Sequence, residues 1–374
     1  MSKTAFIPVN EPLLGQKEKK YLLECIETGW ISSEGAFVEE FEKKLAKVSL
    51  REFGIAVSSG TAALDVAIEA LGISKGDEVI MPSFTIISCI NQIVRVGAIP
   101  ILVDSDPNTW NMNINQIEGK ITVRTKAIMV VHIYGLPVDL DPVLSLAKNY
   151  NLKVIEDAAE MHGQSYKGKP CGSFGDISTL SFYPNKHITT GEGGMILTND
   201  AQLAKNCRSL RNLCFQPNKR FVHERLGWNY RMTNMQAALG VAQLSRLDEF
   251  VNRKTRMGAL YNKLLKGVQG IQLPLESTPY ANNIYWVFGL ILDKSIDFDA
   301  KEAMIRLGRL GIGCRPFFYP MHQQPVLRKM GLFKGEYYPE AEKLYQRGFY
   351  IPSGMALSDE QINRVAEALV KVLK

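Results

Sequence analysis

The chain has 374 residues, of which 46% are hydrophobic and 22% charged, and its formal net charge is +6. This balance is ordinary for a folded globular protein and argues against a disordered chain, a dedicated nucleic-acid binder or a membrane-surface binder. The length predicts two or three domains, or one large α/β unit with a smaller companion.

The N-terminal segment and the cysteines both favour a cytoplasmic protein. Residues 1–20 contain no apolar segment typical of a secretory signal, and the apolar stretch at 127–135 is far too short to span a membrane. The six cysteines include no CxxC pair and do not cluster with histidines, so we expect neither a disulfide framework nor a metal site. We expect no membrane or nucleic-acid partner.

Short apolar runs, rich in β-branched residues, recur along the first 200 residues and alternate with segments of helical pattern. Runs that are apolar on both faces and alternate with helices are typical of a mostly parallel sheet covered on both sides. The sequence therefore predicts a large α/β domain over 35–250 with a seven-stranded sheet, preceded by a segment, 1–34, that packs with the smaller domain. The expected strands lie within 54–59, 77–82, 99–106, 125–135, 153–160, 177–183 and 194–200; the expected helices lie within 18–30, 61–71 and 141–150.

The remainder of the chain predicts a smaller α+β domain over 251–374. Residues 233–265 have the pattern of one long amphipathic helix that connects the two domains. Beyond it we expect a strand within 282–292 and helices over 299–311 and 358–373.

The common nucleotide-binding loops are missing from the sequence. No GxGxxG follows any predicted strand, so the usual dinucleotide fingerprint is absent. The segment GQSYKGKP (163–170) is close to a Walker A loop, but Pro170 replaces the hydroxyl residue that would hold magnesium.

Two strand ends carry polar residues suited to a charged ligand. In SSGTAAL (58–64), Gly60 allows close approach of the backbone, and the hydroxyls of Ser59 and Thr61 join helix N-terminal amides that attract an anion. By itself this segment fits a simple helix cap better than an anion site. Asp157 ends the strand VIED, where a half-buried carboxylate needs a cation such as a protonated pyridine nitrogen, or else serves a structural role.

Two further segments carry a lysine and an asparagine. Lys186 lies in SFYPNKHITTGEGGM (181–195), between a strand and a glycine-rich turn; a desolvated lysine there can lose its proton and form a Schiff base, although most lysines are solvated surface residues. Asn229 precedes the long helix in GWNYRMTNMQAA (227–238). Taken alone, this segment indicates a helix cap.

Together, an anion-binding turn, a strand-end Asp, and a Ser and Lys in one loop suit pyridoxal 5′-phosphate. The order and spacing resemble fold-type-I aminotransferases and, more narrowly, the sugar aminotransferases of the DegT/DnrJ/EryC1/StrS family. The resemblance runs from about residue 8 to the C-terminus. Its motifs are GWISSEGAFVEEFE (29–42), SSGTAAL (58–64), GDEVIMPSFT (76–85), VIEDAAE (154–160), GSFGDISTLSFYPNKHITTGEGGM (172–195), NYRMTNMQAALGVAQL (229–244) and RPFFYPMHQQP (315–325).

The resemblance implies pyridoxal 5′-phosphate as the cofactor and assigns a role to each motif. Lys186 would bond to the cofactor and carry protons, while Asp157 would pair with the ring nitrogen. Glu160 would lie near the phenolic oxygen, where relatives often have Gln. Asn229 would reach the phosphate in the other subunit, which requires a homodimer with shared active sites. The expected phosphate ligands are Gly60, Thr61 and Ser181, and Ser59 is also expected to contact the cofactor. The expected contacts of the nucleotide sugar are Trp30, His187, Arg315 and His322.

Two residues depart from the pattern of the family. Ile86 stands where relatives usually have an aromatic residue that stacks on the pyridine ring, so stacking would be aliphatic, or Phe84 would substitute. His187 directly follows Lys186, whereas a related branch replaces the lysine itself with histidine and performs 3-dehydration of a GDP-keto-sugar. We interpret His187 as a neighbour that contacts substrate or as an ordinary turn residue.

The activity implied by the resemblance is transfer of the amino group of L-glutamate to C4 of a nucleotide-linked 4-keto-6-deoxy sugar. The favoured acceptor is GDP-4-keto-6-deoxy-D-mannose, and the product would serve surface polysaccharide (O-antigen) biosynthesis. The sequence leaves open a UDP- or dTDP-linked acceptor, amination at C3, a pyridoxal-phosphate-dependent 3-dehydratase and a non-catalytic sensor.

Overall fold

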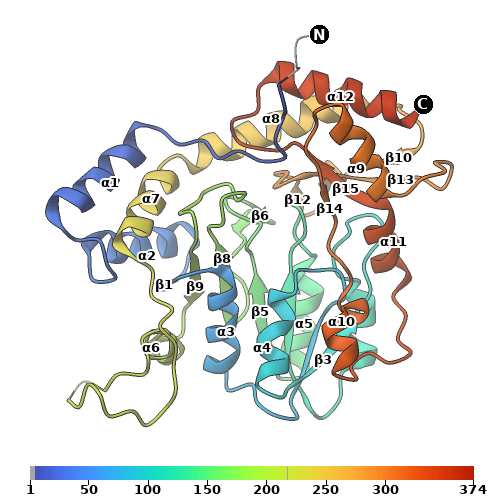
Figure 1. Ribbon diagram of the computed structural model, residues 1–374. Coiled ribbons are helices and arrows are strands. Elements are labelled where there is room, and N and C mark those ends of the chain that lie inside the picture. Colours follow the sequence, from blue (N-terminus) through green and yellow to red (C-terminus); the bar gives the residue numbers. More distant parts are fainter. Residues whose placement is uncertain (1–4, 217) are drawn as a thin grey trace.

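A seven-stranded sheet forms the centre of the larger part of the protein (Figure 1), whose computed structural model describes residues 5–216 and 218–374. The strand order is β1-β9-β8-β5-β4-β2-β3, and β9 alone runs antiparallel to both of its neighbours. This mostly parallel sheet confirms the predicted fold class. The strands are β1 (Phe53–Val57), β2 (Glu78–Pro82), β3 (Ile99–Val103), β4 (Thr125–Val131), β5 (Lys153–Asp157), β8 (Ile177–Ser181) and β9 (Gly194–Thr198).

Helices cover both faces of this sheet because its strands are apolar on both sides. In β4, Ala127 and Met129 join one hydrophobic cluster while Ile128 and Val130 join the other. The first cluster includes α3 (Gly60–Ala70), α4 (Ser88–Arg95) and α6 (Ala201–Leu210). The second includes α2 (Ala36–Val48), α5 (Leu140–Asn149) and α7 (Asn234–Leu244).

The C-terminal part contains a four-stranded antiparallel sheet with its own hydrophobic cluster (Figure 1). Its strands follow the order β10 (Ile271–Gln272), β13 (Phe288–Leu292), β15 (Gly348–Ile351) and β14 (Arg315–Pro316). Helices α8 (Leu247–Leu265), α9 (Ala300–Arg309) and α12 (Asp359–Leu373) supply apolar side chains to this cluster. The strand and both helices predicted in this region are present.

The prediction of one helix over 233–265 was wrong, because the chain breaks it between α7 and α8. Thr233 caps α7, which ends at Leu244, and α8 begins at Leu247. Arg246 leaves the helical conformation (φ −116°, ψ 13°) and pairs with Glu18 and Glu249, at 3.5 and 2.9 Å. Glu18 is more than 200 residues from Arg246 in the sequence, and no glycine or proline marks the break.

The N-terminal segment contacts both parts of the protein. Ile7 pairs with Ile312 beside the smaller sheet, whereas α1 (Gln16–Thr28) packs against α7.

Within 5–216 and 218–374, no helix is long and apolar enough to cross a membrane. The remaining elements are η1 (Ile114–Gln116), η2 (Glu118–Lys120), β6 (Ser165–Tyr166), β7 (Lys169–Pro170), β11 (Ser277–Thr278), β12 (Ala281–Asn282), η3 (Met321–Gln323), α10 (Pro325–Lys329) and α11 (Pro339–Arg347).

Candidate active site

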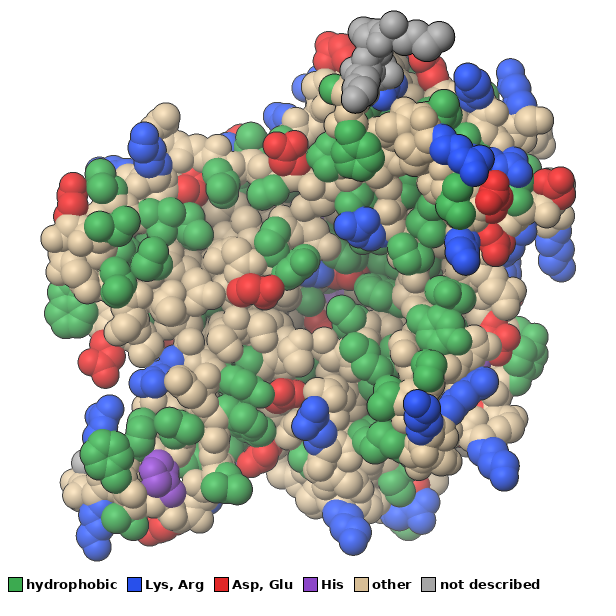
Figure 2. Space-filling model, viewed as in Figure 1, with side chains coloured by type: hydrophobic (Ala, Val, Ile, Leu, Met, Phe, Trp, Pro, Cys, Tyr) green, Lys and Arg blue, Asp and Glu red, His purple; other side chains and the backbone are tan. Residues whose placement is uncertain are grey.

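A cavity of about 410 Å³ lies where β1, β5 and β8 of the large sheet end, a common position for ligand sites in α/β proteins. Figure 2 shows the hollow near the centre of this face, with hydrophobic side chains around it. The segments after the large-sheet strands supply the polar residues of the wall. The C-terminal part closes the cavity with Trp286, Phe318 and Tyr350.

One end of the cavity is built around the N-terminus of α3 and is rich in hydroxyl groups. Ser59 caps the helix by accepting a hydrogen bond from the Ala62 amide at 3.1 Å. A side chain on Gly60 would place its Cβ 2.7 Å from the Cβ of Ser181, so only glycine fits this approach. Thr61 and Ser88 join the first turns of α3 and α4 through their hydroxyls, which lie 2.9 Å apart. Helix amides and hydroxyls in this arrangement suit a phosphate group.

Asp157 lies at the end of β5, almost fully buried in the cavity wall. Its Oδ1 accepts a hydrogen bond from the Ala159 amide at 3.0 Å, and its Oδ2 accepts one from the Cys89 thiol at 3.3 Å. Burial raises the pKa of Asp157, and the Ala159 amide and Cys89 oppose that rise. A cation that reaches this carboxylate would stabilise its charged form, as a protonated ring nitrogen does.

Lys186 projects into the same cavity from the loop after β8. Its Nζ lies 3.7 Å from Oε1 of Glu160 and 3.8 Å from the centre of the Trp286 ring. Burial lowers the pKa of Lys186, while Glu160 and Asp157 oppose that shift. A lysine whose pKa is lowered in this way can act as a nucleophile and as a proton carrier.

Glu160 is held so that it faces Lys186. Its Oε2 accepts a hydrogen bond from the Tyr134 amide at 2.7 Å. Burial raises the pKa of Glu160 to about 8, despite the opposing effect of Lys186. At neutral pH the carboxyl can therefore carry a proton and donate a hydrogen bond, as the amide of a glutamine does.

These features fit pyridoxal 5′-phosphate. The cavity combines a phosphate-binding helix end, a buried carboxylate for the ring nitrogen and a desolvated lysine for the aldehyde. Ser181 lies so close to Gly60 that residue 60 has no room for a Cβ. This close approach supports the assignment of this end of the cavity to the phosphate group.

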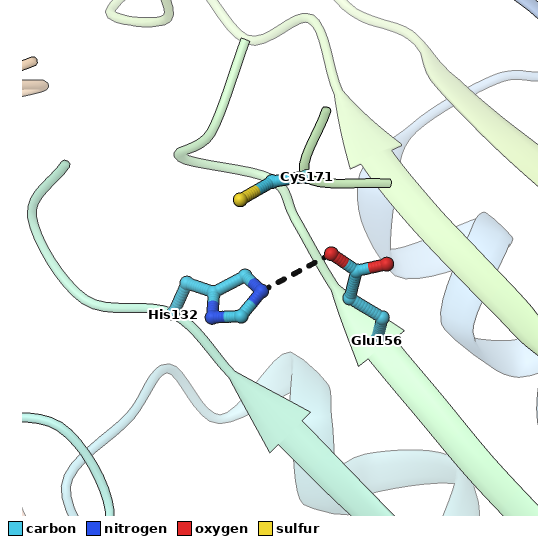
Figure 3. Close-up of side chains that lie close together, drawn as sticks. All are labelled: His132, Glu156 and Cys171. Atoms are coloured by element: carbon cyan, nitrogen blue, oxygen red, sulfur yellow. Dashed lines mark hydrogen bonds and ion pairs between the residues drawn. The ribbon is translucent and has the colours of Figure 1, made fainter. Parts of the chain in front are cut away.

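A second buried cluster, His132, Glu156 and Cys171, could suggest a metal site (Figure 3). Nδ1 of His132 accepts the Val138 amide at 3.0 Å, so Nε2 carries the proton and donates to Glu156 at 3.2 Å. Both carboxylate oxygens of Glu156 also accept amide hydrogen bonds, from residues 172 and 174. Because these lone pairs are already used, we interpret the cluster as a support for the end of β5.

Comparison with known proteins identifies the family. The profile of the DegT/DnrJ/EryC1/StrS aminotransferase family matches residues 12–370. The chain belongs to this family. It is therefore an aminotransferase that uses pyridoxal 5′-phosphate, with the fold-type-I architecture predicted from the sequence.

Single proteins of known name match this aminotransferase over almost its whole length. It is 44% identical to a GDP-perosamine synthase from Escherichia coli O157:H7, over 97% of this chain and 98% of the relative. It is 42% identical to a GDP-perosamine synthase from Caulobacter vibrioides over the full length of both. The crystal structure of an aminotransferase from Psychrobacter cryohalolentis superimposes with a TM-score of 0.91 at 29% identity, covering 98% of each chain.

The cavity of this aminotransferase gathers most of the residues predicted to bind the cofactor. Ile86 also belongs to its wall, with 47% of its surface exposed, while Phe84 is fully buried behind it. Of these two side chains, only the aliphatic one of Ile86 can therefore contact a cofactor ring bound in the cavity. The predicted residues in the wall are Ser59, Gly60, Thr61, Ile86, Asp157, Glu160, Ser181 and Lys186.

The other predicted residues lie outside the cavity wall formed by the described part of the chain. Asn229 is exposed and accepts a hydrogen bond from Arg231, and Trp30 is 58% exposed on the segment after α1. Arg315 is exposed beside Tyr350, with which it pairs across β14 and β15. His322 is buried between Ser83 and Glu342, at 2.9 Å from each.

His187 is buried and points away from the cavity. Its Nε2 lies 3.3 Å from the carbonyl oxygen of Ile284, and its Nδ1 has no hydrogen-bond partner among the described residues. Burial lowers the pKa of His187 well below its usual value. It therefore packs as a neutral imidazole against the segment before Trp286.

Sequence reasoning missed the aromatic part of the cavity wall. Tyr183 is only three residues before Lys186, so its proximity could have been noticed. Trp286, Phe318 and Tyr350 are about 100 residues or more further along the chain, and the folded contact between the two sheets brings them here. The aromatic run FFY at 317–319 was the only visible signal for Phe318.

Proposed function

We propose that this aminotransferase transfers the amino group of L-glutamate to C4 of GDP-4-keto-6-deoxy-D-mannose and so produces GDP-perosamine. The near full-length identity with enzymes named GDP-perosamine synthase carries the choice of substrate. The arrangement of Lys186, Asp157 and the phosphate-type helix end in one cavity supports the chemistry.

The cofactor, when bound, supplies an aldehyde that takes up the amino group and an aromatic ring that withdraws electrons. Ser59, Gly60, Thr61 and Ser181 would hold its phosphate, and Asp157 would hold its ring nitrogen in the protonated form. Lys186 would bond to the aldehyde and, when displaced by an amino donor, move a proton at Nζ.

The aromatic side of the cavity fits a sugar. Trp286, Phe318 and Tyr350 face the cavity opposite the large sheet, and flat apolar rings of this kind can pack against a sugar ring while excluding water. The exposed guanidinium of Arg315 beside Tyr350 is available for an anionic group such as a diphosphate.

The enzyme in this proposal is a cytoplasmic homodimer with shared active sites. Asn229 is exposed near the end of a loop that carries Phe221 and Leu226, whose exposed fractions are 81% and 88%. Large apolar side chains this exposed favour an interface. A second copy would cover them and could bring Asn229 to the phosphate end of the neighbouring cavity.

The first test is an absorbance spectrum of the protein loaded with pyridoxal 5′-phosphate, before and after addition of L-glutamate. We expect the visible band to be replaced by the near-ultraviolet band of the aminated cofactor. Lys186→Ala, which lacks the amine, is expected to show no such turnover. Cofactor-loaded protein that ignores glutamate and other amino donors would contradict the proposal.

The second test identifies the acceptor. The aminated enzyme is mixed with GDP-4-keto-6-deoxy-D-mannose, and the sugar product is examined by mass spectrometry and NMR. We expect an amino group at C4 and the return of the visible band. Preference for a UDP- or dTDP-linked keto sugar would overturn the choice of nucleotide, and a 3-deoxygenated product would replace transamination with dehydration.

A further inference from the structure

Lys186 meets the face of an aromatic ring that comes from the other part of the chain. Its Nζ lies 3.8 Å from the centre of the Trp286 ring, while the nearest carboxylate oxygen, on Glu160, is 3.7 Å away. A lysine ammonium within about 6 Å of an indole face is attracted by the negative charge of the π system. The Trp286 side chain is buried and that of Lys186 is only 10% exposed, which strengthens this attraction because little water screens it.

The position of Trp286 is fixed by contacts that do not involve Lys186. Its indole N–H donates to the carbonyl oxygen of Asn185 at 2.8 Å, and its own carbonyl oxygen accepts from the buried Lys254 at 2.7 Å. Gly135 lies so close that a Cβ there would be 2.6 Å from the Trp286 amide nitrogen. The ring is therefore a prepared surface rather than a side chain that follows the lysine.

We propose that Trp286 is a positioning residue that receives the ammonium group of Lys186 on its indole face whenever the lysine is not bonded to the cofactor. This inference rests on the proposed function, in which Lys186 is displaced and rebound in each turnover. A displaced lysine without such a surface would have only carboxylates to hold it, and one of those, Asp157, is needed by the ring nitrogen.

The indole face differs from the other groups around Lys186 because it attracts the charged amine without being able to take its proton. Trp286 should therefore oppose the effect of burial and stabilise the protonated lysine. The titratable groups around Lys186 are Asp157 at the end of β5, Glu160 and His162 after it, Cys89 on α4, and the adjacent His187, whose ring points away from the cavity. All of them remain in a variant of Trp286 alone.

The experiment measures how the cofactor-free enzyme captures pyridoxal 5′-phosphate at different pH values. Capture needs the neutral amine, so the midpoint of its pH profile follows the pKa of Lys186, and borohydride reduction followed by mass spectrometry confirms the modified residue. We expect Trp286→Leu to lower the midpoint by about one pH unit. Trp286→Phe, which keeps a weaker ring and loses the N–H, is expected to fall between Leu and the wild type.

Trp110→Phe is the matched control. Trp110 is buried in the same aromatic cluster and packs edge-on against Tyr134, with the two ring centres 6.4 Å apart. Among the described residues, it does not belong to the cavity wall. Its variant is expected to keep the wild-type midpoint. Circular dichroism establishes that each variant is folded, and if Trp286→Leu does not fold, Trp286→Phe must still lower the midpoint.

An unchanged midpoint in folded Trp286 variants would overturn the inference, because it is the result expected if Trp286 only fills space. The proposed function is tested separately by Lys186→Ala, which is expected to show no capture at any pH. If Lys186→Ala still captured the cofactor at another residue, the role of Lys186 itself would fail, whatever the Trp286 variants did.

Discussion

Gly60 shows how one residue can decide whether the phosphate end of the cavity exists. A Cβ at this position would lie 2.7 Å from Cβ and 3.0 Å from Oγ of Ser181. We expect Gly60→Ala to push Ser181 and the start of α3 apart and to weaken binding of pyridoxal 5′-phosphate at least tenfold, a loss equivalent to about 1.4 kcal/mol or more. Equilibrium titration of the apoenzyme measures this loss.

Gly308→Ala is the control for that measurement. Gly308 lies in α9 with open space around its Cβ position, so alanine is expected to leave cofactor affinity unchanged and to favour the helix slightly. Equal affinities of the Gly60 and Gly308 variants would show that the close approach to Ser181 has no part in binding.

Glu160 makes the stability of the apoenzyme depend on pH. Burial raises its pKa from 4.5 to about 8, so the folded protein holds a proton that the unfolded chain releases between those values. The stabilisation is complete below about pH 4.5 and is lost as the pH rises towards 8. Glu160→Gln has no proton to release, so we expect its free energy of unfolding, relative to wild type, to rise by about 3 kcal/mol between pH 5 and 8.

Urea unfolding of the apoenzymes at several pH values from 5 to 8 checks this difference. Glu52→Gln, which alters an exposed carboxylate, provides a parallel reference curve. The glutamine variant is also expected to keep much of the activity, because its amide can still donate where the protonated Glu160 does. A constant difference between the Glu160→Gln and wild-type curves across this range would contradict the raised pKa.

The residues predicted from the sequence are those whose chemistry is carried by local motifs. Asp157 ends a strand, and Gly60 and Lys186 each lie after one. Strand ends of a parallel sheet meet at one edge, so the convergence of these residues in the cavity follows from the pattern. Trp286 and Tyr350 could not be predicted in the same way. They belong to the smaller sheet region, and only its docking against the large sheet makes them neighbours of Lys186.

At the scale of elements, α1 is fastened to the break between α7 and α8 by one buried carboxylate. Glu18 accepts hydrogen bonds from Gln243 Nε2 at 2.6 Å and from the Gly15 amide at 2.9 Å, and it lies 3.5 Å from Arg246. Glu18→Ala would leave the Gly15 amide without its acceptor and would leave Gln243 and Arg246 with only the Leu13 carbonyl oxygen and Glu249, respectively. We expect it to lower the free energy of unfolding by about 2–3 kcal/mol, measured by urea unfolding.

The comparison for this prediction is Glu27→Ala on the exposed face of the same helix. It removes a carboxylate of equal size from α1, so both variants gain the same helix propensity. Similar stabilities of the Glu18 and Glu27 variants would mean that α1 is held by its apolar contacts alone.

The elements were predictable where hydrophobic pattern alone determines them. Each strand of the large sheet is an apolar run, because both of its faces are covered by helices. The break at Ser245–Arg246 was not predictable, because the amphipathic pattern continues across it without a glycine or proline. Its cause is the set of contacts that Arg246 and Gln243 make with Glu18, a residue more than 200 positions earlier.

At the scale of the whole molecule, two segments that flank the large sheet each carry several exposed apolar side chains. Phe221, Val222 and Leu226 lie on the loop before α7, and Ile26 and Trp30 lie at the end of α1. A single copy leaves these side chains in water, whereas an isologous interface would bury both segments twice. This grouping supports the proposed homodimer.

A mixture of two inactive variants tests whether the active sites are shared. Lys186→Ala removes the amine, and Asn229→Asp places a negative charge where the partner's phosphate would bind. In a mixed dimer, the intact lysine of one subunit would face the intact asparagine of the other, so one of the two sites would be complete. Random re-association of equal amounts should then restore about a quarter of the wild-type activity, by two-fold symmetry.

The alternative arrangement gives a different result. If Asn229 served the cavity of its own chain, the subunit that keeps the lysine would always carry the altered asparagine, and mixing would restore nothing. Analytical ultracentrifugation of the mixture shows whether mixed dimers have formed, so a failure to exchange subunits is distinguished from a failure to complement. Restoration in a sample that sediments as monomers would contradict a shared site, because the two intact residues then never meet.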